Sequence, residues 1–130
     1  MIFNYKKYGP GTLRPVIPIV LETNKRRLPY ESLIDSGADI CIFPAELAGI
    51  LGIKIMQGKK KHVSGITGKV EDYYLHKIAL EVGGWPYEAE VGFLPKIATL
   101  GYGVLGQKGF FDIFQIKFDY CKGIIEVKPK

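Results

Sequence analysis

The amino-acid sequence predicts an all-β domain with one or two short helices. Eight Tyr and seven Phe, together with many Val and Ile, favour strands over helices. Sixteen Gly and eight Pro interrupt the chain often, as the turns between many short strands require. Hydrophobic residues make up 47% of the 130 positions, which is enough to bury a core without disulfide or metal support. We therefore expect one globular domain over residues 1–130.

The first part of the chain is expected to form three strands. They are predicted over residues 16–23, 28–34 and 40–43. Pro15 and Pro18 place the first of them toward a sheet edge, because proline has no N–H to donate to a neighbouring strand. Residues 24–27 are polar and predict a turn. Residues 1–12 are polar and interrupted by Gly and Pro, which predicts a loose N-terminal strand or arm.

The rest of the chain is expected to alternate hairpins with short helices. Pro44 suits the first turn of a helix over residues 44–51, and Gly52 suits the position just past its end. Gly-rich turns predict hairpins. The predicted hairpins pair residues 59–63 with 69–75, 78–82 with 87–93, and 116–119 with 124–127. A short strand over residues 103–106 precedes a predicted one- or two-turn helix over residues 107–114, where Phe110, Phe111 and Phe114 have the spacing of core residues.

Cysteine and histidine usage gives no support to a disulfide framework, a metal site or a cofactor. Cys41 lies in an apolar run, where a buried and inert thiol is expected, and Cys121 is far along the chain. His62 and His76 fall on different predicted strands, without the spacing of metal ligands.

The net charge of +5 raises the question of nucleic-acid binding, since positive charge attracts phosphate. The lysines are spread along the chain, however, and residues 59–62 are expected to form a solvated strand face. A nucleic-acid-binding β domain therefore stays only a third hypothesis, and we expect no nucleic-acid partner. No stretch approaches the roughly 20 apolar residues of a membrane span, so we expect a cytoplasmic protein without membrane contact.

A polar loop, Asp35-Ser36-Gly37-Ala38-Asp39, separates two apolar strands. A carboxylate at the mouth of a tight turn is exposed to substrate yet held in place by the strand before it. Gly37 allows a close approach of backbone, and the hydroxyl of Ser36 can donate to a neighbouring main chain. Asp-Ser-Gly is also common in β-turns, so a purely structural role of Asp35 is the alternative interpretation.

The segment from Leu33 to Asp39 resembles the active-site signature of retropepsin-like aspartic peptidases, whose triplet is Asp-Thr/Ser-Gly followed by Ala. Gly103-Val104-Leu105-Gly106 is similar to the hydrophobic-hydrophobic-Gly strand of that family, which packs beside the active-site loop. The Gly-rich turn over residues 64–68 falls where the family has its mobile flap. The resemblance spans about residues 16–127. It implies a closed β barrel or sandwich with a flap hairpin.

The resemblance further implies an aspartic endopeptidase that acts on a polypeptide without metal or cofactor. In such enzymes two carboxylates share a proton, because like charges about 3 Å apart do not both ionise readily. One carboxylate is the general base for a bound water, and the other polarises or protonates the scissile carbonyl. The sequence has a single Asp-Ser-Gly triplet, so the second Asp35 is expected from another copy in an isologous homodimer.

Residue roles also follow from the resemblance. Asp35, Ser36 and Gly37 would form the catalytic triplet, with Ser36 hydrogen-bonded across the dimer axis. The residues expected at the substrate are Ala38, Asp39, Ser64, Gly65 and Ile66. For Asp39 a structural role in the loop is an equal alternative, and the flap glycines are equally explained as hairpin residues.

One position departs from many viral members of the family. They carry Arg directly after the Gly of the C-terminal strand, whereas this chain has Gln107, which could hydrogen-bond Asp39 without charge. The second hypothesis for function is therefore a protein of the same fold that binds peptides or partner proteins and cleaves little or nothing.

Overall fold

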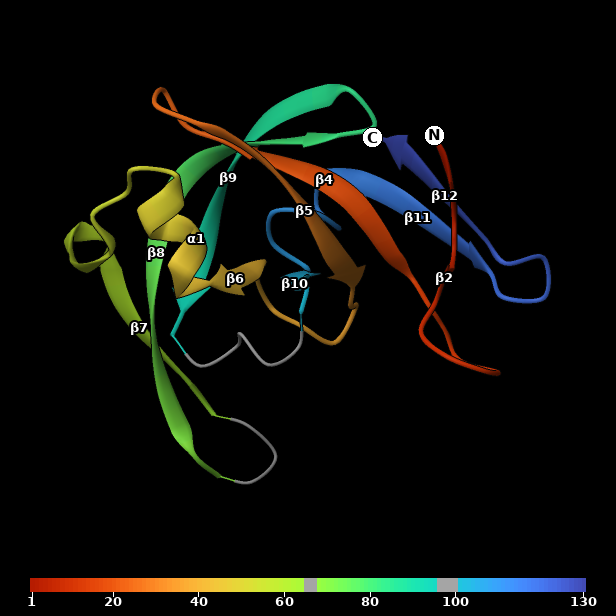
Figure 1. Cartoon of the computed structure of the whole chain (residues 1–130), viewed down its shortest axis with the longest axis horizontal. Coiled ribbons are helices and arrows are strands. Elements are labelled where there is room, and N and C mark those ends of the chain that lie inside the picture. The colour runs from red at the N-terminus through yellow and green to blue at the C-terminus, as the bar shows by residue number, and fades with distance from the viewer. Residues whose placement is uncertain (65–67, 96–100) are drawn as a thin grey trace.

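The structure is a computed structural model that describes residues 1–64, 68–95 and 101–130, and it confirms the all-β prediction (Figure 1). The strands are β1 (Ile2–Asn4), β2 (Lys6–Lys7), β3 (Leu13–Arg14), β4 (Val16–Glu22), β5 (Arg27–Ile34), β6 (Ile42–Pro44), β7 (Lys59–Ser64), β8 (Val70–Val82), β9 (Trp85–Leu94), β10 (Gly103–Leu105), β11 (Phe114–Asp119) and β12 (Ile124–Pro129). The helical segments of this part are α1 (Ala45–Ile50) and the single 3-10 turn η1 (Ile55–Gln57).

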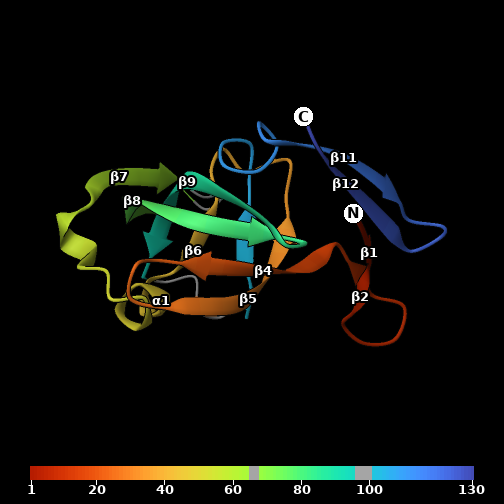
Figure 2. The same ribbon diagram turned by 90° about the horizontal axis from the view of Figure 1, so that it is seen from above.

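The central feature of the fold is a seven-stranded sheet in the order β4-β5-β10-β6-β9-β8-β7. The sheet closes on itself, because β4 also pairs with β8. In Figure 2 the strands β4 and β5 lie on one side of the molecule and β7, β8 and β9 on the other. A second sheet, β1-β12-β11, stands beside this barrel and brings the two chain ends together (Figure 1).

The predicted edge position of residues 16–23 is correct for only part of β4. Pro18 faces Glu31 of β5, and in the described structure residues 16–19 pair with β5 alone. Residues 20–22 have a second partner, residues 79–81 of β8. Among the described residues, one side of β4 is therefore unpaired only at residues 16–19, the part of the strand that contains Pro18.

The strand β8 is longer than predicted. Residues 69–75 and 78–82 are predicted as two strands, but β8 runs without a break over 13 residues. His76 and Lys77 pair with β9, and His76 Nε2 lies 2.8 Å from the carbonyl oxygen of Ile55. The turn into β9 has two residues, Gly83 and Gly84, with φ of 57° and 83°, as a tight hairpin turn requires.

The predicted helix over residues 107–114 is wrong, because this segment folds as successive turns. Gly109 has φ of 97°, which a right-handed helix does not allow. The main-chain N–H of Asp112 donates across five residues to the oxygen of Gln107 at 3.0 Å, and the Asp112 carboxylate accepts from the N–H of Gly109 at 2.9 Å. The predicted helix over residues 44–51 is confirmed as α1, with Pro44 at its N-cap.

The hydrophobic core lies inside the closed sheet and extends under the second sheet. Its largest fully buried side chains are Phe43, Phe93, Phe110, Phe114, Ile17, Ile19, Leu21, Leu51, Leu80, Leu105, Ile125 and Val82. The rings of Phe43 and Phe93 lie 6.4 Å apart at its centre. Phe110 and Phe114 belong to the core as predicted, whereas Phe111 is half-buried.

Within residues 1–64, 68–95 and 101–130 there is no helix of the length and apolar character needed to cross a bilayer.

We expect Phe93→Ala to lower the free energy of unfolding by about 3–5 kcal/mol, because it removes a fully buried ring and leaves a cavity against Phe43. Met56→Ala is the control, since 73% of the Met56 side chain is exposed, and it should change stability by less than about 0.5 kcal/mol. Urea unfolding at one protein concentration measures both. Equal midpoints would contradict the placement of Phe93.

Candidate active site

The loop that carries Asp35 is positioned by β10. This strand lies between β5 and β6, parallel to β5 and antiparallel to β6. Because both strands are hydrogen-bonded to β10, the chain that joins them must pass around the end of β10. Asp35 is the first residue after β5, and its N–H donates to the oxygen of Leu105 at 2.9 Å. The carboxylate therefore starts from a buried strand and reaches the surface of the loop.

Hydrogen bonds within the loop orient the Asp35 carboxylate. Its Oδ1 accepts from the N–H of Gly37 at 2.9 Å, and its main-chain oxygen accepts from the N–H of Ala38 at 3.1 Å. Asp35 is half-buried, whereas Ser36, Gly37 and Asp39 are exposed. In the described part of the chain Oδ2 has no hydrogen-bond partner, so one carboxylate oxygen is held and the other is available.

The residues after β10 fasten the other half of the loop. The N–H groups of Gln107 and Lys108 donate to the oxygens of Ala38 and Asp39, at 2.8 and 3.0 Å. The side-chain amide of Gln107 donates to the oxygen of Ser36 at 2.7 Å. The hydrogen bond that the Gln107 side chain could make with Asp39 does not form in the described structure, where the amide donates to the main chain of Ser36 instead.

Gly106 allows this close approach of two backbones. A Cβ at this position would lie 2.3 Å from the oxygen of Ile40 and 2.7 Å from that of Ala38, both of them main-chain atoms that cannot move aside freely. The N–H of Gly106 instead points at Cys41 Sγ, 3.4 Å away. The hydrophobic-hydrophobic-Gly pattern of residues 104–106 thus has a steric cause.

Comparison with solved structures identifies this arrangement. The chain superposes on a retropepsin-like aspartic protease from Rickettsia conorii with a TM-score of 0.67 and 16% sequence identity, over 96% of this chain and 95% of that one. The chain has the retropepsin-like fold. It is also similar to the EIAV protease solved in complex with the inhibitor HBY-793, with a TM-score of 0.55 and 16% identity, over 78% of this chain and 88% of that one. No protein-family model matches the sequence, and no curated protein sequence does either.

The described residues include the two arms of the predicted flap hairpin. The arms of the hairpin are β7 and the first half of β8, paired from Lys59 with Leu75 to Ser64 with Val70. They project away from the barrel (Figure 1). Ser64 is exposed at the end of β7, while Gly65 and Ile66 lie outside the described residues.

A charged cluster joins the arms of this hairpin and was missed at the level of sequence. His62 Nδ1 and Lys60 Nζ lie 2.5 Å and 3.4 Å from the two carboxylate oxygens of Asp72. The hydrogen bond with His62, followed by the contribution of Lys60, lowers the pKa of the Asp72 carboxyl below its ordinary value. The signal for this cluster is the cross-strand pairing of His62 with Asp72, which is visible only once the hairpin register is known.

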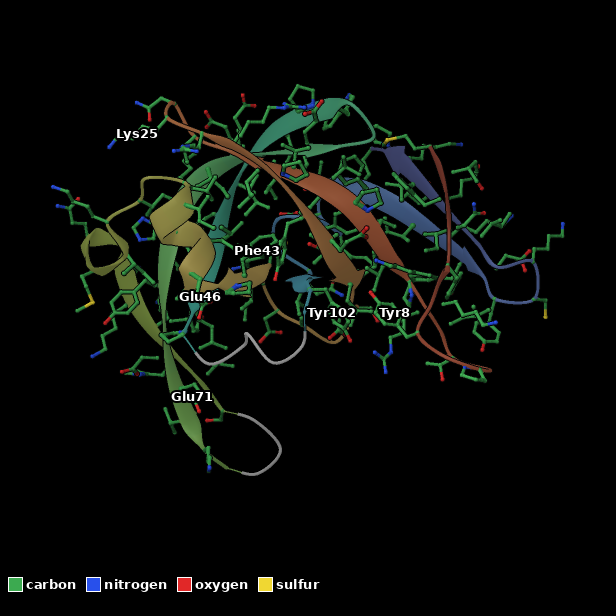
Figure 3. The ribbon with its side chains drawn as sticks, viewed as in Figure 1. Tyr8, Lys25, Phe43, Glu46, Glu71 and Tyr102 are labelled. Atoms are coloured by element: carbon green, nitrogen blue, oxygen red, sulfur yellow. The ribbon has the colours of Figure 1, made fainter. Side chains whose placement is uncertain are left out.

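Aromatic residues of the N-terminal arm pack beside the start of β10. The rings of Tyr8 and Tyr102 meet edge to face at 5.8 Å, and the Arg14 guanidinium lies over the Tyr8 ring at 4.9 Å (Figure 3). The oxygen of Pro15, just before β4, accepts from the N–H of Ile34 at the end of β5 at 2.9 Å. The predicted loose arm is ordered, because β1 pairs with β12 and β2 pairs with β3.

Within the described ranges, the His, Cys, Asp and Glu side chains form no group of three or more that could hold a metal ion.

Gly106→Ala is expected to destabilise the folded chain by about 2–4 kcal/mol, because the new methyl group collides with the main-chain oxygens of Ala38 in the Asp35 loop and of Ile40 just after it. Gly49→Ala is the matched control: its Cβ would meet nothing within 4 Å, and alanine favours the helix α1. Urea unfolding of the two variants makes the comparison. A Gly106 variant as stable as the Gly49 variant would contradict the close approach.

The two thiols should differ in reactivity. Cys41 is fully buried and its Sγ accepts from the N–H of Gly106, and burial raises its pKa to about 12, so at pH 8 it is protonated and inaccessible. Cys121 is exposed. We expect a disulfide reagent at pH 8 to modify one thiol of the native chain and both thiols in denaturant. Rapid modification of both thiols in the native chain would contradict the buried position of Cys41.

Proposed function

We propose that the chain is an aspartic endopeptidase that works as a homodimer, with a water molecule activated between the Asp35 carboxylates of two copies. The observation that carries this proposal is the position of Asp35. In a chain with the retropepsin-like fold, Asp35 is the first residue after β5. One of its carboxylate oxygens accepts from the N–H of Gly37, and the other has no partner within the described structure.

The proposed chemistry requires the two carboxylates to hold one proton between them. The ionised carboxylate takes a proton from the water as the water oxygen bonds to the scissile carbonyl carbon. The protonated carboxyl gives its proton to the carbonyl oxygen, and a tetrahedral diol forms. Breakage of the C–N bond follows, with proton transfer to the leaving nitrogen. The products are a carboxylic acid and an amine, and no metal or cofactor takes part.

A second copy is part of the proposal because one chain supplies one Asp-Ser-Gly loop. A twofold axis beside the loop would bring two such loops together and bury the same surface twice. The exposure of Ser36 and Gly37 supports this arrangement, since both are free to meet a partner, and the hydroxyl of Ser36 would bond across the axis.

An extended polypeptide is the proposed substrate. Ala38 and Asp39 present main-chain and side-chain groups beside Asp35, and Ser64 stands at the end of the β7 arm of the flap, next to its tip. Gly65 and Ile66 would complete the flap over the substrate. Pairing of an extended peptide with main-chain groups on both sides would leave its alternate side chains free for recognition.

One observation favours the second hypothesis, a peptide-binding protein that cleaves little or nothing. The loop is tied down within its own chain by the neutral amide of Gln107, which reaches Ser36 rather than Asp39. In the described structure Asp39 therefore has no charged partner at this position, and the geometry that two loops need for catalysis rests on neutral hydrogen bonds.

We expect Asp35→Asn to lower the rate of cleavage of an unfolded protein at least a hundredfold, because the amide can neither accept the water proton nor share one. Asp119→Asn makes the same chemical change at the end of β11, where the Asp119 carboxylate accepts from the N–H of Lys122, and should keep full activity. Cleavage is followed by mass spectrometry, and sedimentation should show that all three proteins are dimers.

The outcomes separate the two hypotheses. Equal activity of the Asp35 variant would remove Asp35 from the mechanism, and an active monomer would remove the shared site. A dimer that binds peptides without cleaving them would support the peptide-binding hypothesis.

A further inference from the structure

A groove of about 680 Å³ lies between the strands β7–β9 and the turns that follow β10. Its apolar lining comes from the half-buried side chains of Ile40, Tyr73, Leu75 and Ile113 and from the buried Ala89. The groove borders the hydrophobic core, which includes Ala89 and against which Ile113 packs, and it is open to solvent. A surface of this kind can hold an extended segment of polypeptide, since it offers both apolar contacts and a polar rim.

The groove begins at the active-site loop. Ile40, in its lining, directly follows Asp39, and the N–H of Lys108, also in the lining, donates to the oxygen of Asp39 at 3.0 Å. Tyr73 connects the two places as well, because burial and then the charge of Asp39 raise the pKa of its phenol. A chain that leaves the site beside Asp39 therefore enters the groove without a gap.

The end of the groove nearest the loop carries positive charge that the described residues do not neutralise. Lys61 stands opposite Tyr73 and Lys59 opposite Leu75 in the β7–β8 register, and Lys108 faces them from the turns after β10. None of these three lysines forms an ion pair with a carboxylate in the described structure.

The far end of the groove is different. There Lys77 forms an ion pair with Glu88 at 3.5 Å and stands opposite Glu90 in the β8–β9 register. Asp112 also lines the groove. Of the four lysines that line the groove, Lys77 is therefore paired, whereas Lys59, Lys61 and Lys108 have no ion pair within the described structure.

We propose that this groove binds the part of the polypeptide substrate that flanks the residues in the cleft, and that it selects acidic side chains there. The inference rests on the proposed function and specifies its substrate class. Lys61 and Lys108 are the selecting residues, and Tyr73 and Leu75 provide the apolar floor. In a twofold dimer the groove occurs twice, so acidic residues are favoured on both flanks of the scissile bond.

A polypeptide fits the groove better than a nucleic acid does. The carboxylates of Glu90 and Asp112 line the same groove and repel a row of phosphates. A peptide can place one or two acidic side chains near the loop and apolar side chains on the floor.

The test uses the Asp35→Asn chain, which holds peptides without cutting them. Two fluorescent peptides of equal length share an apolar centre and differ only in flanks of Glu or of Gln, and anisotropy measures their binding. We expect the Glu peptide to bind roughly tenfold more tightly at low salt, and the preference to shrink as salt screens the charges.

Adding Lys61→Gln and Lys108→Gln should abolish that preference. The matched control adds Lys117→Gln and Lys128→Gln, which remove the same charge from β11 and β12 on the second sheet and should leave the preference intact. Urea unfolding verifies that every variant is folded. Equal binding of the two peptides, or a preference that survives loss of Lys61 and Lys108, would overturn the proposal.

Two further measurements keep the proposals apart. A single-stranded oligonucleotide that displaces the Glu peptide more effectively than the unlabelled peptide does would overturn the groove proposal in favour of a polyanion site. Cleavage by the unsubstituted chain is assayed separately with the same peptides. Cleavage without a flank preference removes the groove proposal alone, and a flank preference without cleavage removes only the proteolytic function.

Discussion

The insertion of β10 between β5 and β6 is the constraint on which the candidate site depends. Main-chain hydrogen bonds on both sides of this short strand determine where the loop with Asp35 emerges, and bonds from residues 106–108 determine how it lies. Each bond is worth only about 1 kcal/mol net. Together they hold a polar loop against a buried strand, so that a carboxylate can be exposed without being mobile.

Much of the fold was predictable because its signals are local. A pair of glycines indicates a tight turn, as Gly83 and Gly84 do, and a proline can indicate the start of a helix, as Pro44 does. Neither signal depends on the rest of the chain. Where the prediction failed, a local pattern competed with a distant contact. The spacing of Phe110 and Phe114 suggested a helix, but Gly109 adopts a positive φ that a helix excludes, and both rings reach the core from turns instead.

The candidate site divides in the same way. The Asp35 loop is visible in the sequence because its chemistry lies in five consecutive residues. The hydrogen bond of the Gln107 amide to Ser36, the contact of Tyr8 with Tyr102 and the lysine groove each join residues far apart along the chain. Nothing in a single sequence states which strands are neighbours, so such contacts become visible only when the register is known.

The continuous strand β8 has a mechanical consequence. One half of it forms the hairpin with β7, and its last residues close the barrel against β4, so the hairpin cannot swing as a separate body. Residues 76–78 pair only with β9, and His76 is anchored there to Ile55. Any bending of the hairpin relative to the barrel must therefore deform this short stretch, which within the described structure has a neighbouring strand on one side only.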